Sequence, residues 1–265
     1  MLIAFSRHYV AIAHNDTLVL MEPEKKVRIE HELDASERIV KLECNHRGGI
    51  ALTDKGRVIF FERYRRDYQS TEVITDIAAS EHDTILVTRE GAFLPLDKRG
   101  EGMKAVPPPA SIAVGSAKIA YITAGKLYMN DQHIPHAYSV MTVAVGGGHT
   151  LFIDSEGEVY GFGNNGHGQL GRGIINYAAN PVRVPFFTKA RKVVAGNEHT
   201  AVLDVHGKLW ICGSNTRGQL GPVESIDGCR HGLAHLYDDV VDVAARGVAT
   251  LILFSNGNVE EIGVR

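Results

Sequence analysis

Several residues of this 265-residue chain return at an interval of fifty positions. The clearest sets are three threonines and two groups of three glycines: Thr150, Thr200 and Thr250; Gly157, Gly207 and Gly257; and Gly163, Gly213 and Gly263. Repeats of this length are typical of chains built from stacked supersecondary units. The fold must therefore be inferred from the repeat unit.

The two clearest copies of the repeat cover residues 143–171 and 193–221, which read VAVGGGHTLFIDSEGEVYGFGNNGHGQLG and VVAGNEHTAVLDVHGKLWICGSNTRGQLG. Each copy has three short apolar runs separated by turn signals, a pattern that predicts an antiparallel meander because the runs are too short for helices. Gly157 and Gly207 stand where a tight hairpin requires a residue that tolerates positive φ.

Weaker copies of the same pattern lie upstream, which brings the number of units to seven. Their hairpin positions are Asp16, Gly56, Gly91, Gly125, Gly157, Gly207 and Gly257. One unit alone would expose an apolar face and two sheet edges, whereas a closed ring buries the faces of every sheet. We therefore predict an all-β, seven-bladed β-propeller forming a single domain, with approximate blades at residues 1–36, 37–72, 73–109, 110–139, 140–190, 191–238 and 239–265.

The two ends of the chain bear on how the ring closes. The sequence stops just after the third apolar run of the last unit, which predicts an incomplete last blade or closure by a strand from the amino end. The first residues align with the repeat and lack a basic leader, so we expect a strand there and not a signal peptide. No apolar run is long enough to span a bilayer, and no membrane partner is expected.

The repeat motif resembles a known family. The segments Gly-x-x-His-Thr, Asp-x-x-Gly and Gly-x-Asn-x-x-Gly-Gln-Leu-Gly are similar to the repeat of the regulator of chromosome condensation family, closely so over residues 140–221. The last blade keeps the spacing but has Ala249 in place of the histidine, and the first four blades keep only the strand pattern. The resemblance implies a compact, divergent propeller. The family's founding member is a nucleotide exchange factor for the Ran GTPase that also docks on nucleosomes.

Most residues that could carry chemistry have a structural explanation. Gly161-x-Gly163-x-x-Gly166 matches a dinucleotide fingerprint, but no helix pattern follows it to receive a pyrophosphate. His149 and His199 are interpreted as donors to neighbouring backbone carbonyls, with metal ligation as the alternative. Asp154 and Asp204 are interpreted as turn caps. We expect no catalytic residue, no cofactor and no metal site.

Net charge and cysteine content limit the class of partner and the cellular compartment to be expected. The formal net charge is −3 and no long run of one sign occurs, so direct nucleic-acid binding is not expected. Cys44, Cys212 and Cys229 have no metal-ligand spacing and predict free thiols in a reducing compartment, the nucleus or the cytoplasm.

Candidate partner-binding residues lie in segments that the repeat does not explain. Two long connections follow Gly163 and Gly213, and a third segment interleaves aromatics with arginines; arginine and tyrosine are common interface anchors. The candidates are Arg63, Tyr64, Arg65, Arg66, Tyr68, His167, Arg172, Tyr177, Arg217 and Arg230. For the segment around Tyr64, a solvated outer strand with extended arginines is the alternative interpretation.

Three classes of function remain after this reasoning. The first is a non-catalytic interaction module that acts as a scaffold subunit of a larger protein assembly, including chromatin-associated ones. The second, implied by the resemblance, is an exchange factor for a Ran-like small GTPase. The third is a hydrolase with a site in the central channel, for which the sequence offers no residue set. We expect the first, with one or more proteins as partners.

Overall fold

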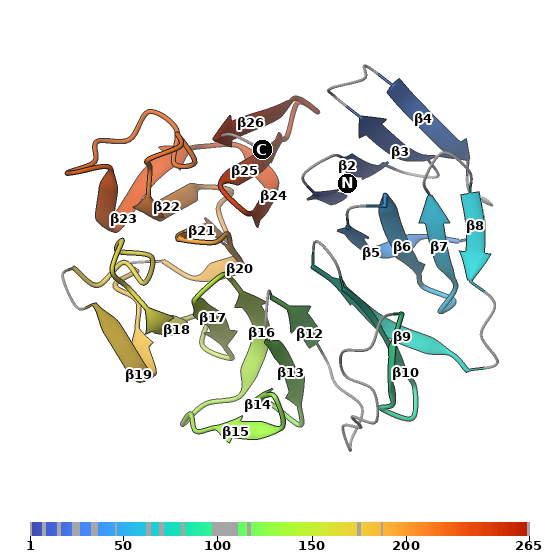
Figure 1. Ribbon diagram of the computed structural model, residues 1–265, viewed down its shortest axis with the longest axis horizontal. Coiled ribbons are helices and arrows are strands. Elements are labelled where there is room, and N and C mark those ends of the chain that lie inside the picture. The colour runs from blue at the N-terminus through green and yellow to red at the C-terminus, as the bar shows by residue number, and fades with distance from the viewer. Residues whose placement is uncertain are drawn as a thin grey trace.

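The computed structural model describes residues 2–6, 9–14, 17–22, 27–32, 37–45, 47–61, 65–68, 72–80, 83–96, 111–115, 118–173, 176–186 and 188–263. These residues form strands and turns, with no helix among them. Seven antiparallel sheets stand around a central axis, and the two chain ends lie near each other (Figure 1). The prediction of a seven-bladed propeller is confirmed.

Each blade is a meander whose first strand lies nearest the axis. Blades 1 to 4 consist of β1 (Leu2–Phe5), β2 (Val10–His14), β3 (Thr17–Glu22) and β4 (Val27–Glu32); β5 (Ile39–Cys44), β6 (Gly49–Thr53), β7 (Val58–Phe61) and β8 (Arg65–Tyr68); β9 (Ile74–Ala79), β10 (Thr84–Thr88) and β11 (Phe93–Pro95); and β12 (Ser111–Val114), β13 (Ile119–Thr123), β14 (Lys126–Met129) and β15 (Gln132–Ile134).

The last three blades contain the clearest copies of the repeat. They consist of β16 (Val140–Val145), β17 (His149–Asp154), β18 (Val159–Asn164) and β19 (Tyr177–Arg183); β20 (Ala190–Ala195), β21 (His199–Asp204), β22 (Leu209–Ser214) and β23 (Cys229–Tyr237); and β24 (Val240–Arg246), β25 (Ala249–Phe254) and β26 (Val259–Gly263).

The hydrophobic core is divided among the interfaces between blades. Each of seven buried clusters joins two neighbouring blades; the cluster of blades 5 and 6, for example, unites Leu151 and Val159 with Val193 and Val202. Leu170, from the Gly-Gln-Leu-Gly motif, is buried in this cluster and fills the interface. Burial of one such side chain stabilises the fold by about 1.5–3 kcal/mol, so every interface contributes to the ring.

The ring closes by packing, without an added strand. Within the described residues the last blade has three strands, ordered β24-β25-β26, while β1 pairs with β2 in its own sheet. Ile3 and Phe5 pack on Leu251 and Leu253, and the Ile3 backbone N–H donates to Asp242 Oδ2 at 3.0 Å. Of the two expected arrangements, the incomplete last blade is the one observed.

Candidate interaction faces

The two faces of the propeller differ because the strands of each blade run in alternating directions. In blade 5, β16 starts at one face and ends at Val145, which pairs with Thr150. His149 pairs with Gly163, so the connection after β18 emerges where β16 ends. The long connections of blades 5 and 6 therefore share one face, which we name the loop face. The opposite face, where the innermost strands begin, is named the bulge face.

A β-bulge marks the beginning of the innermost strand in five blades. Pairing with the second strand skips one residue at each of these positions: Val40, Thr75, Met141, Arg191 and Val241. A bulge leaves its extra residue unpaired and redirects the side chain. At these bulges the side chains of Val40, Met141 and Val241 are 54%, 60% and 37% exposed. Sequence reasoning missed these residues, because an apolar side chain such as Met141 looks like part of the buried run in which it stands.

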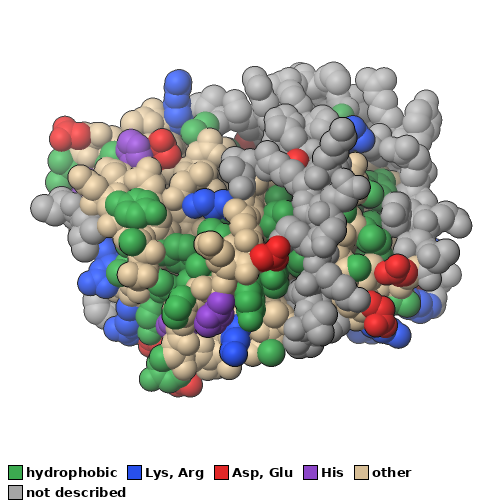
Figure 2. Space-filling model, turned by 60° about the horizontal axis from the view of Figure 1, so that its bottom comes forward, with side chains coloured by type: hydrophobic (Ala, Val, Ile, Leu, Met, Phe, Trp, Pro, Cys, Tyr) green, Lys and Arg blue, Asp and Glu red, His purple; other side chains and the backbone are tan. Residues whose placement is uncertain are grey.

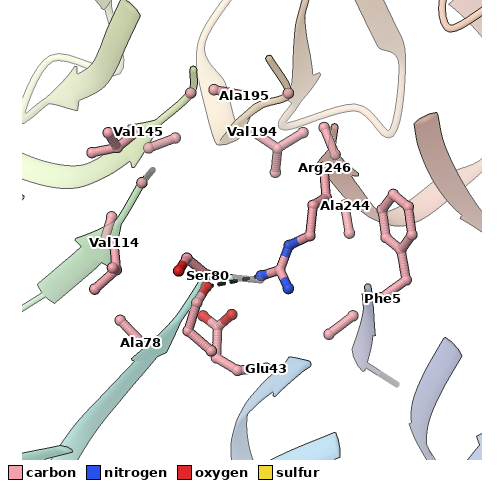
Figure 3. A pocket seen from close by; sticks show the side chains of 18 of the residues that line it. Phe5, Glu43, Ala78, Ser80, Val114, Val145, Val194, Ala195, Ala244 and Arg246 are labelled. Carbon is pink, nitrogen blue, oxygen red and sulfur yellow. Dashed lines mark hydrogen bonds between the residues drawn. The ribbon is translucent and has the colours of Figure 1, made fainter. Parts of the chain in front are cut away.

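The innermost strands enclose a central cavity of about 700 Å³. Figure 3 shows small apolar side chains such as Val114, Val145 and Val194 on its wall, with Glu43 and Arg246 projecting inward. The Arg246 guanidinium donates to the carbonyls of Cys44 and Ala79, 2.8 Å away in the second case, and so ties blade 7 to blades 2 and 3. Burial raises the pKa of the Glu43 carboxyl.

His149 and His199 link successive blades by a shared pattern. His149 Nε2 lies 2.9 Å from Thr200 Oγ1, and His199 Nε2 lies 2.9 Å from Thr250 Oγ1. Each threonine hydroxyl donates its proton to a carbonyl, that of Gln169 or Gln219, so each histidine must donate from Nε2. The histidines therefore hold neighbouring blades together, and Nε2 of each has a threonine hydroxyl as its partner. Burial lowers the pKa of His149 to about 3 and that of His199 to about 4.

The two aspartates cap hairpins. Asp154 Oδ1 accepts hydrogen bonds from the backbone N–H groups of Glu156 and Glu158, and Asp204 Oδ1 does the same for His206 and Lys208. Together with Gly157 and Gly207, at φ of +76° and +81°, they form the predicted turns. Among the described residues no group of three or more His, Cys, Asp or Glu is placed to hold a metal ion.

Five of the candidate partner-binding residues lie on the loop face. His167, Arg172 and Tyr177 come from the connection of blade 5 or the strand after it, and Arg217 and Arg230 from the equivalent part of blade 6. The two connections touch, because Arg172 bridges to Gly232 and the Gly173 N–H donates to the His231 carbonyl at 2.9 Å.

These five residues differ in exposure and contacts. Arg172 and Arg217 are exposed, and Arg172 Nη1 donates to the Arg183 carbonyl at 3.0 Å. Tyr177 is 66% exposed, whereas Arg230 is half-buried. His167 is half-buried between Glu198 and Cys229, with Nε2 3.4 Å from Glu198 Oε1 and Nδ1 3.5 Å from Cys229 Sγ. The sequence candidates for partner binding did not include Glu198, Cys229 or the exposed Ile226 of this face.

Three of the remaining candidates are on blade 2, in a different blade from the loop-face residues. Arg65, Arg66 and Tyr68 belong to the outermost strand β8, while Arg63 and Tyr64 lie outside the described residues. On the face in view in Figure 2, Lys and Arg side chains are scattered among acidic and apolar ones. Within the described part of the chain, no helix is long and apolar enough to cross a membrane.

Comparison with protein families identifies the repeat. A model of the regulator of chromosome condensation (RCC1) repeat matches residues 156–203, and a second RCC1 repeat model matches residues 142–169 and 190–219. These are blades 5 and 6, where the His–Thr links and capped hairpins recur. Two blades of this propeller carry RCC1 repeats. No curated protein sequence matches the chain.

Solved structures share the fold of this RCC1-repeat propeller. They include Prp20p from Saccharomyces cerevisiae (13% identity, 99% of this chain and 82% of that chain, TM-score 0.75), the Cps50 (Swd1) β-propeller domain of Myceliophteria thermophila (12%, 100% and 96%, 0.64) and human WBSCR16 (12%, 99% and 76%, 0.53). At such low identity the likeness concerns the fold alone.

Proposed function

We propose that this RCC1-repeat propeller is a non-catalytic scaffold subunit that binds a partner protein through its loop face. The observation that carries the proposal is the exposure of two large apolar side chains there. Ile226 and Tyr177 are 76% and 66% exposed, more than any other large apolar residue in the described part of the chain. Arg172 and Arg217 are exposed on the same face.

These side chains have the properties of interface anchors. Tyrosine and arginine are enriched among the few residues that dominate binding energy, because they bury large surfaces and also hydrogen-bond. The rigid blades beneath position the two connections, and the contacts between residues 172–173 and 231–232 hold one against the other. An ordered loop loses little entropy when it binds.

The partner is proposed to be a protein of the nucleus or cytoplasm, including a chromatin-associated one. The structure of Prp20p was described together with its binding to Gsp1p and histones, and another similar propeller is part of the mitotic checkpoint complex. These propellers support a role in protein assembly. The scattered cations of Figure 2 and the net charge of −3 do not favour direct nucleic-acid binding.

Exchange activity on a Ran-like small GTPase is the alternative function, favoured by the fold match to Prp20p over 99% of this chain. It would require the loop face to displace nucleotide from the GTPase. A fluorescent-nucleotide release assay with Ran distinguishes the two functions. We expect release at the spontaneous rate; acceleration in proportion to the propeller concentration would support the alternative and contradict the scaffold proposal.

The scaffold proposal is tested by capture of binding proteins from native extract on the immobilised chain. A loop-face variant, Tyr177→Ser with Ile226→Ser, is compared with a bulge-face variant, Met141→Ser with Val241→Ser, because both remove two exposed apolar side chains. We expect the loop-face variant alone to lose a partner that the wild type retains in stoichiometric amount. Loss only in the bulge-face variant would place the interface on the opposite face and overturn the proposal.

A further inference from the structure

A thiol, an imidazole and a carboxylate lie in successive contact on the loop face. Cys229 Sγ lies 3.5 Å from His167 Nδ1, and His167 Nε2 lies 3.4 Å from Glu198 Oε1. The three residues come from the start of β23, the connection after β18 and the turn before β21. The His167 and Glu198 side chains are 39% and 44% exposed, and Cys229 is half-buried, so small molecules can reach the set.

The chemistry of the three groups determines the direction of proton transfer between them. An ionised Glu198 favours the proton of neutral His167 on Nε2, which leaves Nδ1 as a lone-pair acceptor facing the Cys229 thiol. This is the arrangement in which an imidazole activates a thiol and a third group orients the imidazole.

We propose that Cys229 is a modification site that undergoes thiol–disulfide exchange with low-molecular-weight disulfides, with His167 as its base. The Cys229 thiol proton passes to His167 Nδ1 while the sulfur attacks one sulfur of the disulfide. The S–S bond of the small molecule breaks, and the released thiolate recovers the proton from His167. The products are a mixed disulfide on Cys229, which is oxidised, and one reduced thiol.

The surroundings explain why the base is needed. Partial burial and the negative charges of Glu198 and Asp227 raise the pKa of the Cys229 thiol. Few thiolates therefore exist at neutral pH, and reaction depends on proton transfer within the pair. Arg230, the next residue in β23, and His167 are the basic groups beside the site.

The other two cysteines provide an internal contrast. Cys44 and Cys212 are buried, and burial raises the pKa of Cys212 to about 12. Among the described residues, both thiols contact backbone carbonyls, with Cys44 Sγ 3.1 Å from the Gly48 oxygen and Cys212 Sγ 3.7 Å from the Gln169 oxygen. Cys229 is thus the one thiol of the chain that is both reachable and paired with a base. The site lies on the proposed docking face, but its reactivity does not depend on the proposed function.

The test measures the rate at which the folded chain reacts with 2,2′-dithiodipyridine between pH 5.5 and 9, with mass spectrometry to locate the adduct. We expect one adduct, on Cys229, and a rate that changes less with pH around neutrality than the tenfold per pH unit of a thiol that reacts only as the free thiolate. His167→Ala should slow the reaction at pH 6.5 at least about tenfold, and added imidazole should restore part of the rate.

The Glu198→Gln variant distinguishes two roles of Glu198, orienting His167 and raising the pKa of the Cys229 thiol. If Glu198 only raised the pKa of the thiol, its loss would accelerate the reaction; if it orients His167, its loss should slow the reaction. Equal unfolding midpoints confirm that each variant folds, and glutathione disulfide should give the same adduct. An unreactive Cys229 in the wild type, or a His167→Ala variant with unchanged rate and pH profile, would overturn the proposal.

Discussion

Asp242 of β24 joins blades 6, 7 and 1. Its Oδ1 lies 2.6 Å from Lys192 Nζ and 2.9 Å from its neighbour's backbone nitrogen, that of Val243, while Oδ2 accepts from the Ile3 N–H. Since the innermost strands of different blades do not pair, a carboxylate that accepts from both sides replaces the missing ladder hydrogen bonds at the point where the ring closes.

The same device recurs on the other side of the ring. Asp76 of β9 lies 2.7 Å from Lys41 Nζ and accepts the N–H groups of Ile77 and Ile112 at 2.8 and 2.9 Å. Blades 2, 3 and 4 are thus joined as blades 6, 7 and 1 are. The described residues include these two aspartate links, at positions that correspond in the repeat.

Replacement of Asp242 by Ala should destabilise the ring. It leaves two buried backbone N–H groups without acceptors and Lys192 without its partner, so we expect the free energy of unfolding to fall by about 2–4 kcal/mol in urea denaturation. Lys192→Met should cost less than about 1 kcal/mol, because that side chain is partly solvated. Equal losses for the two variants would show that the ion pair, and not the backbone bonds, is the important contact.

Acid should destabilise the protein through His149 and His199. Burial holds their pKa values at about 3 and about 4, below the value of 6.5 in the unfolded chain, so the unfolded state binds more protons below pH 6.5. The stability they confer is complete above pH 6.5 and is lost as the pH falls toward 4, by about 1.4 kcal/mol per pH unit for each histidine. Urea midpoints from pH 7 to 5 measure this slope.

His199→Gln provides the control for that titration. The variant should have lower stability at pH 7, because the link to Thr250 is altered, but its dependence on pH should be shallower by the contribution of one histidine. An identical slope in the variant would mean that other groups cause the acid sensitivity.

Alanine substitutions at Gly213 and Gly257 distinguish the free-energy cost of backbone strain from that of steric overlap. Both have positive φ, +110° and +85°, but a Cβ at Gly213 would lie 2.4 Å from the Glu198 carbonyl oxygen, whereas none lies within 4 Å at Gly257. Gly257→Ala should cost about 1–2 kcal/mol from conformation alone. Gly213→Ala should cost clearly more in the same denaturation experiment, since backbone atoms must move. Comparable costs would contradict the observed packing of β22 on the turn before β21.

Arg172 and Arg217 should matter for binding and little for folding. Both side chains are exposed, so the double replacement by Ala should change the free energy of unfolding by less than about 1 kcal/mol. Affinity for the captured partner should fall at least about tenfold, as expected for anchor residues. Loss of folding would instead assign the arginines a structural role.

The sequence predicted those parts of the fold that depend on residues close together in the chain. The hairpin glycines Gly157 and Gly207 and the capping aspartates Asp154 and Asp204 belong to local turns, and the hairpin positions counted along the chain gave the seven blades. Two of the threonines with the fifty-residue period, Thr200 and Thr250, turned out to receive the histidines of the preceding blade, His149 and His199. A period alone does not reveal that its members touch.

Contacts that break the repeat could not be predicted in this way. Lys192 and Asp242 occupy one repeat position with opposite charges, so their pairing appears only when the ring is closed. Met141 looks like part of a buried run until the bulge turns it outward. Cys229 and His167 are 62 residues apart and meet because two connections of unequal sequence fold against each other. The loop-face residues were found because they departed from the repeat, and their partner is still a proposal.

Site-specific photocrosslinking tests the docking face most directly. A photoreactive amino acid is placed at Ile226 on the loop face or at Met141 on the bulge face, and the folded protein is irradiated in native extract. Docking on the loop face predicts one major crosslinked partner from position 226 and none from position 141. This crosslink should be unchanged by EDTA and should be lost when Arg172 and Arg217 are replaced by Ala. Crosslinks from position 141 alone, or a small GTPase trapped at position 226 only after EDTA strips its nucleotide, would contradict this prediction.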